Sequence, residues 1–99
     1  MFIARIAMDT AGKLQFYVYI LKCRDGSFYT GYTKDLTERT HQHQTGKGAR
    51  YTKAHPPIGI AYVEMFESRS QAMKREREIK KLSHQQKQAL IASNGTKNR

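Results

Sequence analysis

Arg39 and His43 are a candidate pair for chemistry, because side chains four residues apart lie on the same face of a helix. A guanidinium can hold an anion, and an imidazole can bind or release a proton near neutral pH. A helix surface exposed to solvent would explain the pair equally well. A hairpin-like segment directly before the pair is rich in tyrosine, with Tyr17, Tyr19, Tyr29 and Tyr32.

Glu76 is the most informative single residue in the sequence. With 100° of rotation per residue, it shares a narrow sector with Ala72 and Ile79 on the apolar side of a helix predicted over residues 68–82. A carboxylate on a core-facing stripe is costly unless a metal ion, a basic side chain or a water-filled cleft compensates it. A functional carboxylate and a salt bridge to Lys or Arg both remain open, whereas Glu78 points away and is interpreted as a surface charge.

The overall charge predicts a polyanionic partner, although a solvated basic surface is the alternative. Eighteen Lys and Arg residues against eight Asp and Glu residues give a net charge of +10 at pH 7, an excess typical of nucleic-acid-binding domains. Part of this charge lies in a glycine-containing loop, residues 46–55, whose composition suits phosphate neutralisation and base stacking. The candidate nucleic-acid-binding residues in this loop are Lys47, Arg50, Tyr51, Lys53 and His55.

Three other motifs do not support a function. His41 and His43 form an H-x-H pair, but side chains two residues apart on a helix point away from each other, so they cannot both bind one zinc ion. The segment "GKG" at residues 46–48 lacks the Ser or Thr and the upstream glycine spacing of a phosphate-binding loop. Cys23 is the single cysteine, which excludes an intrachain disulfide, and we interpret it as a small buried hydrophobic residue.

The composition also indicates the cellular compartment in which the protein is expected. A single cysteine fits a reducing environment, and no apolar run approaches the length of a membrane span. The first residues, "MFIARIAM", have neither a basic n-region nor a small-residue cleavage site. We therefore expect a cytoplasmic protein with no membrane partner, and a monomer by default.

The order of elements predicts a small α/β (α+β) fold. Aromatic and β-branched runs indicate three strands, and Ser, Asp and Gln at capping spacings indicate the helices. We expect a three-stranded antiparallel sheet flanked by helices, in the order β-β-α-β-α-α. The predicted strands are 16–23, 27–33 and 58–66, and the predicted helices are 35–45, 68–82 and 83–94, with one short helical turn at 49–53.

A chain of 99 residues is expected to form one domain. Its predicted bounds are 16–93. An N-terminal extension at 1–15 either adds a short strand or is poorly ordered. Asn94-Gly95 is predicted to end the last helix, so that residues 94–99 form a frayed tail.

The ordered set of motifs resembles the GIY-YIG nuclease superfamily, and most closely its short stand-alone members. The two signature elements correspond to Tyr17-Val18-Tyr19 and Tyr29-Thr30-Gly31. Further along, "TKDLTER" resembles the segment that ends in the catalytic arginine, "TGKGARYT" resembles a segment of the stand-alone group, and "SQAMKREREIKKLS" resembles the helix with the metal-binding glutamate. The resemblance extends from about Tyr17 to Leu90, and Tyr32 departs from the lysine that some relatives have.

The resemblance implies hydrolysis of phosphodiester bonds in nucleic acid, with DNA expected ahead of RNA, in repair or recombination. Glu76 would hold one Mg²⁺ or Mn²⁺ ion, a hard cation that suits a single carboxylate plus waters and substrate oxygens. Arg39 would present its planar charge to the phosphate. Tyr19 would take the proton from the attacking water, and Tyr29 and His43 would orient the water or assist.

Two other classes of function remain open. A non-catalytic nucleic-acid-binding module would use the basic surface, including Lys34 and the loop at 46–55. A protein-interaction domain would use the same surface on acidic partners. A pure binding module has no need for a carboxylate on the apolar stripe, so Glu76 favours the nuclease.

The hairpin between the two signature elements can adopt either of two registers. A two-residue loop, Asp25-Gly26, would place Tyr19 and Tyr29 on opposite faces of the sheet. A three-residue loop with Gly26 at positive φ would place both tyrosines on one face and pair Tyr19 with Gly31. The absent side chain of Gly31 would then leave room beside the Tyr19 ring. We therefore expect the three-residue loop, because a shared site requires it.

Overall fold

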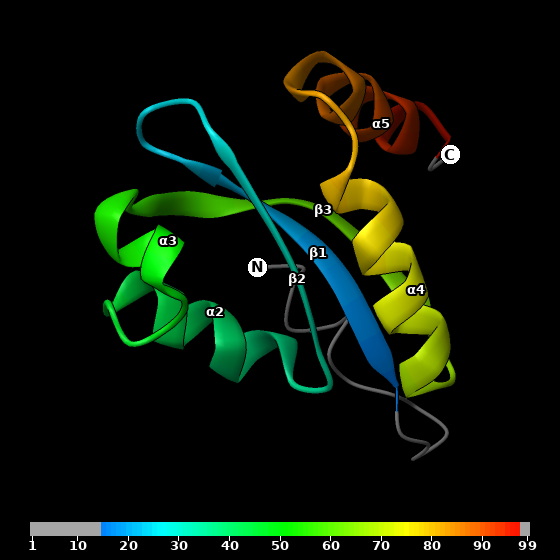
Figure 1. The fold of residues 1–99 in the computed structure, drawn as a ribbon, viewed down its shortest axis with the longest axis horizontal. Coiled ribbons are helices and arrows are strands. Elements are labelled where there is room, and N and C mark those ends of the chain that lie inside the picture. The colour runs from blue at the N-terminus through cyan, green and yellow to red at the C-terminus, as the bar shows by residue number, and fades with distance from the viewer. Residues whose placement is uncertain (1–14, 98–99) are drawn as a thin grey trace.

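A computed structural model describes residues 15–97 of the chain, with side chains described as far as Ser93. Within these residues, a β-hairpin is followed by two helices, a third strand and two further helices (Figure 1). The elements are β1 (Phe16–Cys23), β2 (Phe28–Thr33), α2 (Leu36–Gln44), α3 (Arg50–Ala54), β3 (Pro57–Phe66), α4 (Arg69–Lys80) and α5 (His84–Lys97). The predicted α+β order is confirmed, and the predicted turn at 49–53 is the short helix α3.

The predictions for the two ends of the chain have different outcomes. The N-terminal extension at 1–15 lies outside the described residues, apart from Gln15. At the other end, α5 continues through Asn94 and Gly95 to Lys97, so the predicted helix end at Asn94-Gly95 is wrong. A glycine within a helix costs only about 1 kcal/mol relative to alanine, which the hydrogen bonds of a continuing helix can offset.

β1 is the central strand of an antiparallel sheet with the order β2-β1-β3. Alternate residues of β1 point to opposite faces of this sheet. On one face, Val18 and Ile20 pack with the buried residues of α4. On the other face, Tyr19 and Leu21 pack with Leu36 of α2. Helices α4 and α5 thus lie on one side of the sheet, and α2 and α3 lie on the other (Figure 1).

The hairpin between β1 and β2 has the predicted three-residue loop. The N–H of Gly26 donates to the carbonyl of Cys23 over 2.9 Å, and the N–H of Cys23 donates to the carbonyl of Ser27 over 2.8 Å. Gly26 has a φ of 89°, a conformation that glycine adopts without strain. Tyr19 pairs with Gly31, and Tyr19 and Tyr29 both lie on the face of the sheet that α2 covers.

The long helices begin at the predicted capping residues. The side chains of Asp35 and Ser68 accept hydrogen bonds from the backbone N–H three positions on, at 3.0 and 3.2 Å. Ser83 and Gln86 cap the start of α5 reciprocally, at 3.1 and 2.8 Å. Because each cap fixes where its helix begins, it also fixes which side chains of α2 and α4 face the sheet.

A polar clamp holds α4 against β3. The guanidinium of Arg75 donates from Nε and Nη2 to the two carboxylate oxygens of Glu64, each over 2.9 Å. The hydroxyl of Tyr62 donates to the same carboxylate. Burial is the main reason that the pKa of Tyr62 rises to about 12, and Glu64 raises it further. This two-point contact fixes α4 at the residue next to Glu76.

Candidate active site

A buried hydrogen bond between Tyr19 on β1 and His43 on α2 forms the centre of the candidate site. The Tyr19 hydroxyl lies 3.0 Å from Nε2 of His43, and each residue is 1% exposed. Nδ1 of His43 lies 2.7 Å from Oγ1 of Thr52, whose hydroxyl donates to the carbonyl of Ala49 over 2.9 Å. A continuous chain of hydrogen bonds therefore runs from β1 through α2 to the start of α3.

Tyr29 on β2 forms an aromatic wall beside this pair. The centroid of its ring lies 5.0 Å from that of His43 and 6.4 Å from that of Tyr19. Tyr29 also stacks with Tyr51 at 6.0 Å, and Tyr51 stacks with His55 at 4.1 Å. Tyr51 and His55 therefore use ring surface to support Tyr29, and their role in stacking on nucleic-acid bases stays a prediction.

The same row of rings ends at the tip of the hairpin. Nδ1 of His55 lies 2.6 Å from Oδ2 of Asp25, which joins the end of α3 to the β1–β2 loop. Hydrogen bonds from Ser27 and then from His55 hold the pKa of the Asp25 carboxyl well below its usual value. Both partners are solvent-exposed, so we expect the contact to position the loop rather than to add much stability.

Arg39 and Glu76 both act electrostatically on the Tyr19 hydroxyl. The pKa of Tyr19 is raised to about 12, mainly by burial; the hydrogen bond and charge of Arg39 oppose this rise, and the charges of Tyr29 and Glu76 contribute to it. Arg39 is half-buried and donates from Nη1 to Oε1 of Gln42 over 2.9 Å. Tyr29 and His43 thus lie directly beside Tyr19, whereas Arg39 and Glu76 act on its hydroxyl group through their charges, and the convergence of all these residues on one cleft stays a prediction.

Of the two alternatives that the sequence left open for Glu76 on α4, the structure shows the salt bridge, and the role as a metal-binding carboxylate stays a prediction. Its side chain is 16% exposed, and its Oε2 lies 3.3 Å from Nζ of Lys80, so a salt bridge is present. Across residues 15–93, where side chains are described, no group of three or more His, Cys, Asp or Glu side chains could hold a metal ion. One carboxylate completed by waters and substrate phosphate oxygens is a donor set that Mg²⁺ accepts, so Glu76 fits such an ion.

Two glycines make room for the Tyr19–His43 pair. A Cβ atom on Gly31 would lie 2.6 Å from the Tyr19 hydroxyl oxygen, which confirms the predicted reason for glycine at that position. A Cβ atom on Gly48 would lie 2.3 Å from Nδ1 of His43. Gly48 and Thr52 were not predicted as site residues, because both lie in the basic loop, where the cations suggested a surface for nucleic acid.

His43 is uncharged at neutral pH. Burial is the main reason that its pKa falls to about 4, and the charge of Arg39 lowers it further. We expect NMR titration of His43 to give a pKa of about 4. The free energy of unfolding should fall by about 3 kcal/mol as the pH is lowered from about 6.5 to about 4, because the unfolded chain takes up this proton first.

The substitution His43→Gln tests whether His43 causes this loss of stability. We expect the variant to show no such decrease in the free energy of unfolding between about pH 6.5 and about pH 4. The contribution of His43 to the free energy of unfolding is complete above pH 6.5, the approximate pKa of histidine in the unfolded chain. It decreases as the pH is lowered to about 4, and it does not change further at lower pH. A folded-state titration of His43 near pH 6.5 would contradict the assignment of an uncharged imidazole.

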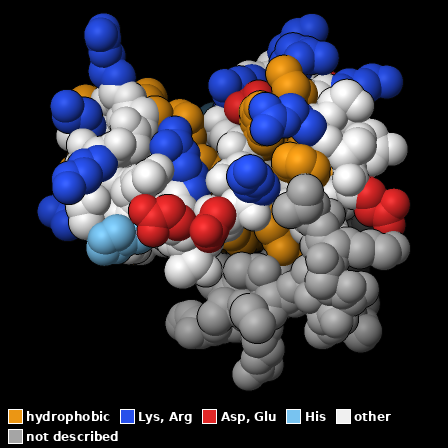
Figure 2. Space-filling view, turned by 90° about the horizontal axis from the view of Figure 1, so that it is seen from below, with side chains coloured by type: hydrophobic (Ala, Val, Ile, Leu, Met, Phe, Trp, Pro, Cys, Tyr) orange, Lys and Arg blue, Asp and Glu red, His pale blue; other side chains and the backbone are white. Residues whose placement is uncertain are grey.

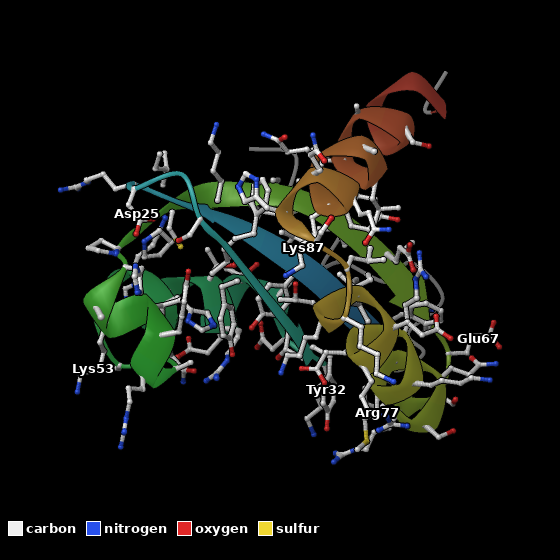
Figure 3. The ribbon with its side chains drawn as sticks, turned by 45° about the horizontal axis from the view of Figure 1, so that its top comes forward. Asp25, Tyr32, Lys53, Glu67, Arg77 and Lys87 are labelled. Carbon is white, nitrogen blue, oxygen red and sulfur yellow. The ribbon has the colours of Figure 1, made fainter. Side chains whose placement is uncertain are left out.

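Basic side chains lie on the surface around the site. Figure 2 shows Lys and Arg side chains on both lobes of the molecule, with a notch in the outline between the lobe of α2 and α3 and that of α4 and α5. Figure 3 shows Lys53 directed away from α3. The predicted nucleic-acid-binding cations are all exposed, namely Lys34, Lys47, Arg50 and Lys53.

A cavity of about 450 Å³ opens beside Arg39. Lys34 and Arg69 contribute cations to its lining, and Phe16 and Tyr32 contribute aromatic rings. Tyr32 lies at the end of β2, where Figure 3 shows it on the side of α4. Asp35 and Glu38 also line this cavity, so its lining carries charges of both signs.

Two further sequence predictions can be compared with the structure. Cys23 is fully buried, as predicted, and burial raises the pKa of its thiol. None of the helices in residues 15–97 is long and apolar enough to cross a membrane.

The sequence matches a known family and several relatives. The family profile described as "GIY-YIG catalytic domain" matches residues 15–89. A UPF0213 protein of Staphylococcus saprophyticus is 53% identical over 76 residues, which cover 77% of this chain and 93% of that protein. A UPF0213 protein of Staphylococcus aureus is 52% identical over 75 residues, which cover 76% of this chain and 92% of that protein.

Two solution NMR structures are similar in fold. A UPF0213 protein from Bacillus halodurans has a TM-score of 0.55 and 44% sequence identity, over 83% of this chain and 87% of that chain. A protein from E. faecalis has a TM-score of 0.61 and 40% identity, over 88% of this chain and 93% of that chain.

Proposed function

We propose that this chain, which belongs to the GIY-YIG catalytic-domain family, hydrolyses phosphodiester bonds in nucleic acid with the help of one divalent metal ion. The family implies nuclease-like chemistry. The observation that supports the proposal most directly is the buried Tyr19–His43 hydrogen bond, on which the charges of Arg39 and Glu76 act. A module that only bound nucleic acid would have no use for a buried phenol paired with an uncharged imidazole beside a carboxylate.

In the proposed reaction, a water molecule attacks phosphorus while Tyr19 accepts its proton. As the oxygen of Tyr19 gains that proton, its own proton passes to Nε2 of His43, so a free phenolate never has to form. This matters because the pKa of Tyr19 is raised to about 12, and a phenolate would be rare at neutral pH. The bond from phosphorus to the leaving oxygen breaks as the new P–O bond forms, and the leaving oxygen takes a proton from solvent. The imidazolium of His43 then releases its proton to solvent, which the low pKa of His43, about 4, favours, and the site returns to its starting state.

Arg39 would stabilise the negative charge that develops on the phosphate. Its guanidinium is planar and permanently charged, and the hydrogen bond to Gln42 orients it. Glu76 would hold the metal ion, which, when bound, supplies Lewis-acid stabilisation to the phosphate and the leaving oxygen. Tyr29 would keep the rings of Tyr19 and His43 in place through its contacts with both.

The basic loop would neutralise phosphates on one side of the site. We expect replacement of Lys47, Arg50 and Lys53 together by glutamine to weaken binding to single-stranded oligonucleotides. The slope of log affinity against log salt concentration should become shallower by about 2, because each lost phosphate contact removes about 0.7 for a single strand. Fluorescence anisotropy at several salt concentrations measures this slope.

The matched control removes the same charge elsewhere, by replacing the exposed Lys22, Lys74 and Lys81 with glutamine. If nucleic acid binds along the loop, the slope of log affinity against log salt concentration should change less in the control than in the loop variant. Equal changes in both variants would show that the loop attracts nucleic acid only through net charge.

A cleavage assay tests the proposed function. The purified chain is incubated with end-labelled single-stranded, duplex and branched DNA and RNA oligonucleotides in Mg²⁺ or Mn²⁺. We expect cleavage of at least one of these substrates, and EDTA should abolish it. Salt-dependent binding without any cleavage would identify a non-catalytic nucleic-acid-binding module instead.

A further inference from the structure

We propose that Thr52 is a positioning residue that fixes His43 in the tautomer with a proton on Nδ1, so that Nε2 can accept a proton from Tyr19. This inference rests on the proposed function for its catalytic meaning, but the tautomer itself is a property of the free protein. Thr52 lies on α3, nine positions after His43 in the sequence, and is only 1% exposed.

The hydrogen bonds around Thr52 give the direction of each proton. A threonine hydroxyl has one proton to donate and can accept with its lone pairs. The Thr52 hydroxyl donates its proton to the carbonyl of Ala49 over 2.9 Å. The same oxygen is therefore left to accept from Nδ1 of His43 at 2.7 Å, which requires that Nδ1 carries the proton.

The Tyr19 end of the chain supports the same tautomer. If Nε2 carried the proton, it would donate to the Tyr19 oxygen, and the Tyr19 hydroxyl proton would need another acceptor. Nε2 of His43 is the acceptor that the described residues offer to this buried hydroxyl. Arg39 can only donate to the Tyr19 oxygen, because a guanidinium has no acceptor. The opposite tautomer would thus leave a buried O–H without a partner, which is unfavourable.

The resulting order of donors matches the proposed reaction. Protons point from Tyr19 to Nε2 of His43, from Nδ1 to Thr52, and from Thr52 to the carbonyl of Ala49. When His43 becomes an imidazolium during the reaction, its Nδ1–H remains bonded to Thr52 without any rotation of the ring. Thr52 therefore acts through His43, in the way that a second group orients the base in other proton-transfer sites.

Two substitutions at position 52 separate the hydroxyl from the shape of the side chain. Thr52→Val keeps the size but cannot accept from Nδ1, whereas Thr52→Ser keeps the hydroxyl. Long-range ¹H–¹⁵N NMR of the imidazole nitrogens, without nucleic acid, reports the tautomer of His43 directly. We expect the Nδ1–H form in the wild type and in Thr52→Ser, and a mixture of both tautomers in Thr52→Val.

Cleavage provides the second measurement. We expect Thr52→Val to lower kcat by about 10- to 100-fold with little change in KM, and Thr52→Ser to stay within a few-fold of the wild type. Thermal melting identifies any loss of fold in either variant. An Nε2–H tautomer in the wild type, or an unchanged tautomer in a folded Thr52→Val, would overturn the inference. Absence of cleavage by a wild type that has the Nδ1–H tautomer would overturn the proposed function instead.

Discussion

Replacement of Glu76 by glutamine is expected to reduce metal-dependent cleavage by about 1,000-fold while the fold is retained. Glutamine keeps the size of the side chain but loses the charge that attracts a hard divalent cation. A bound metal contributes several kcal/mol to phosphoryl chemistry, and a factor of 1,000 corresponds to about 4 kcal/mol. Affinity for nucleic acid should stay the same or increase, because the substitution removes a negative charge near the phosphate.

Two matched variants distinguish a metal-binding carboxylate from a structural one. Glu78→Gln removes a carboxylate from the same helix, at an exposed position whose partner is Arg75 at 3.2 Å. Lys80→Met removes the salt bridge and leaves the Glu76 carboxylate in place. Both controls should keep cleavage close to that of the wild type, because partly exposed ion pairs contribute little to stability.

Binding of Mn²⁺, measured by electron paramagnetic resonance without nucleic acid, gives a readout that does not depend on activity. We expect Glu76→Gln to weaken this binding and Glu78→Gln to leave it unchanged. If Glu76 served only the ion pair with Lys80, the Mn²⁺ affinity of Glu76→Gln would match that of the wild type.

The features that the sequence predicted well depend on residues close together in the chain. The capping residues Asp35 and Ser68 were recognisable because each cap bonds to a residue three positions on. The hairpin register needed one more consideration, since the loop sequence alone favours two residues over three. The requirement that Tyr19 and Tyr29 share a face decided between them, and the structure confirms that choice.

The back of the site could not be predicted from local patterns. Thr52 and Gly48 touch His43 only because the chain turns after α2 and brings α3 beside it. In the sequence both residues stand among Lys and Arg, so the composition indicated a binding loop. Tyr51 was assigned to base stacking for the same reason, although its ring stacks on Tyr29 within the protein. The cationic side chains of this segment face solvent while its small and hydroxyl side chains complete the site.

Gly48→Ala should therefore impair cleavage, although position 48 carries no reactive group. The new Cβ atom would lie 2.3 Å from Nδ1 and 2.8 Å from Cγ of His43, well inside van der Waals contact. The imidazole cannot swing aside cheaply, because it is buried and held on both nitrogens by Tyr19 and Thr52. Either the ring or the loop must move, and each movement breaks the chain of hydrogen bonds at His43.

We expect Gly48→Ala to lower kcat by about 100-fold, within the range that proton-transfer groups contribute, and to lower the free energy of unfolding by about 1–3 kcal/mol through overpacking. Gly59→Ala on β3 is the matched control, because a Cβ atom there meets nothing within 4 Å. The imidazole NMR signals of His43 should shift in Gly48→Ala and stay in place in Gly59→Ala. A folded Gly48→Ala with wild-type cleavage and unchanged His43 signals would show that the position of this imidazole does not control the reaction.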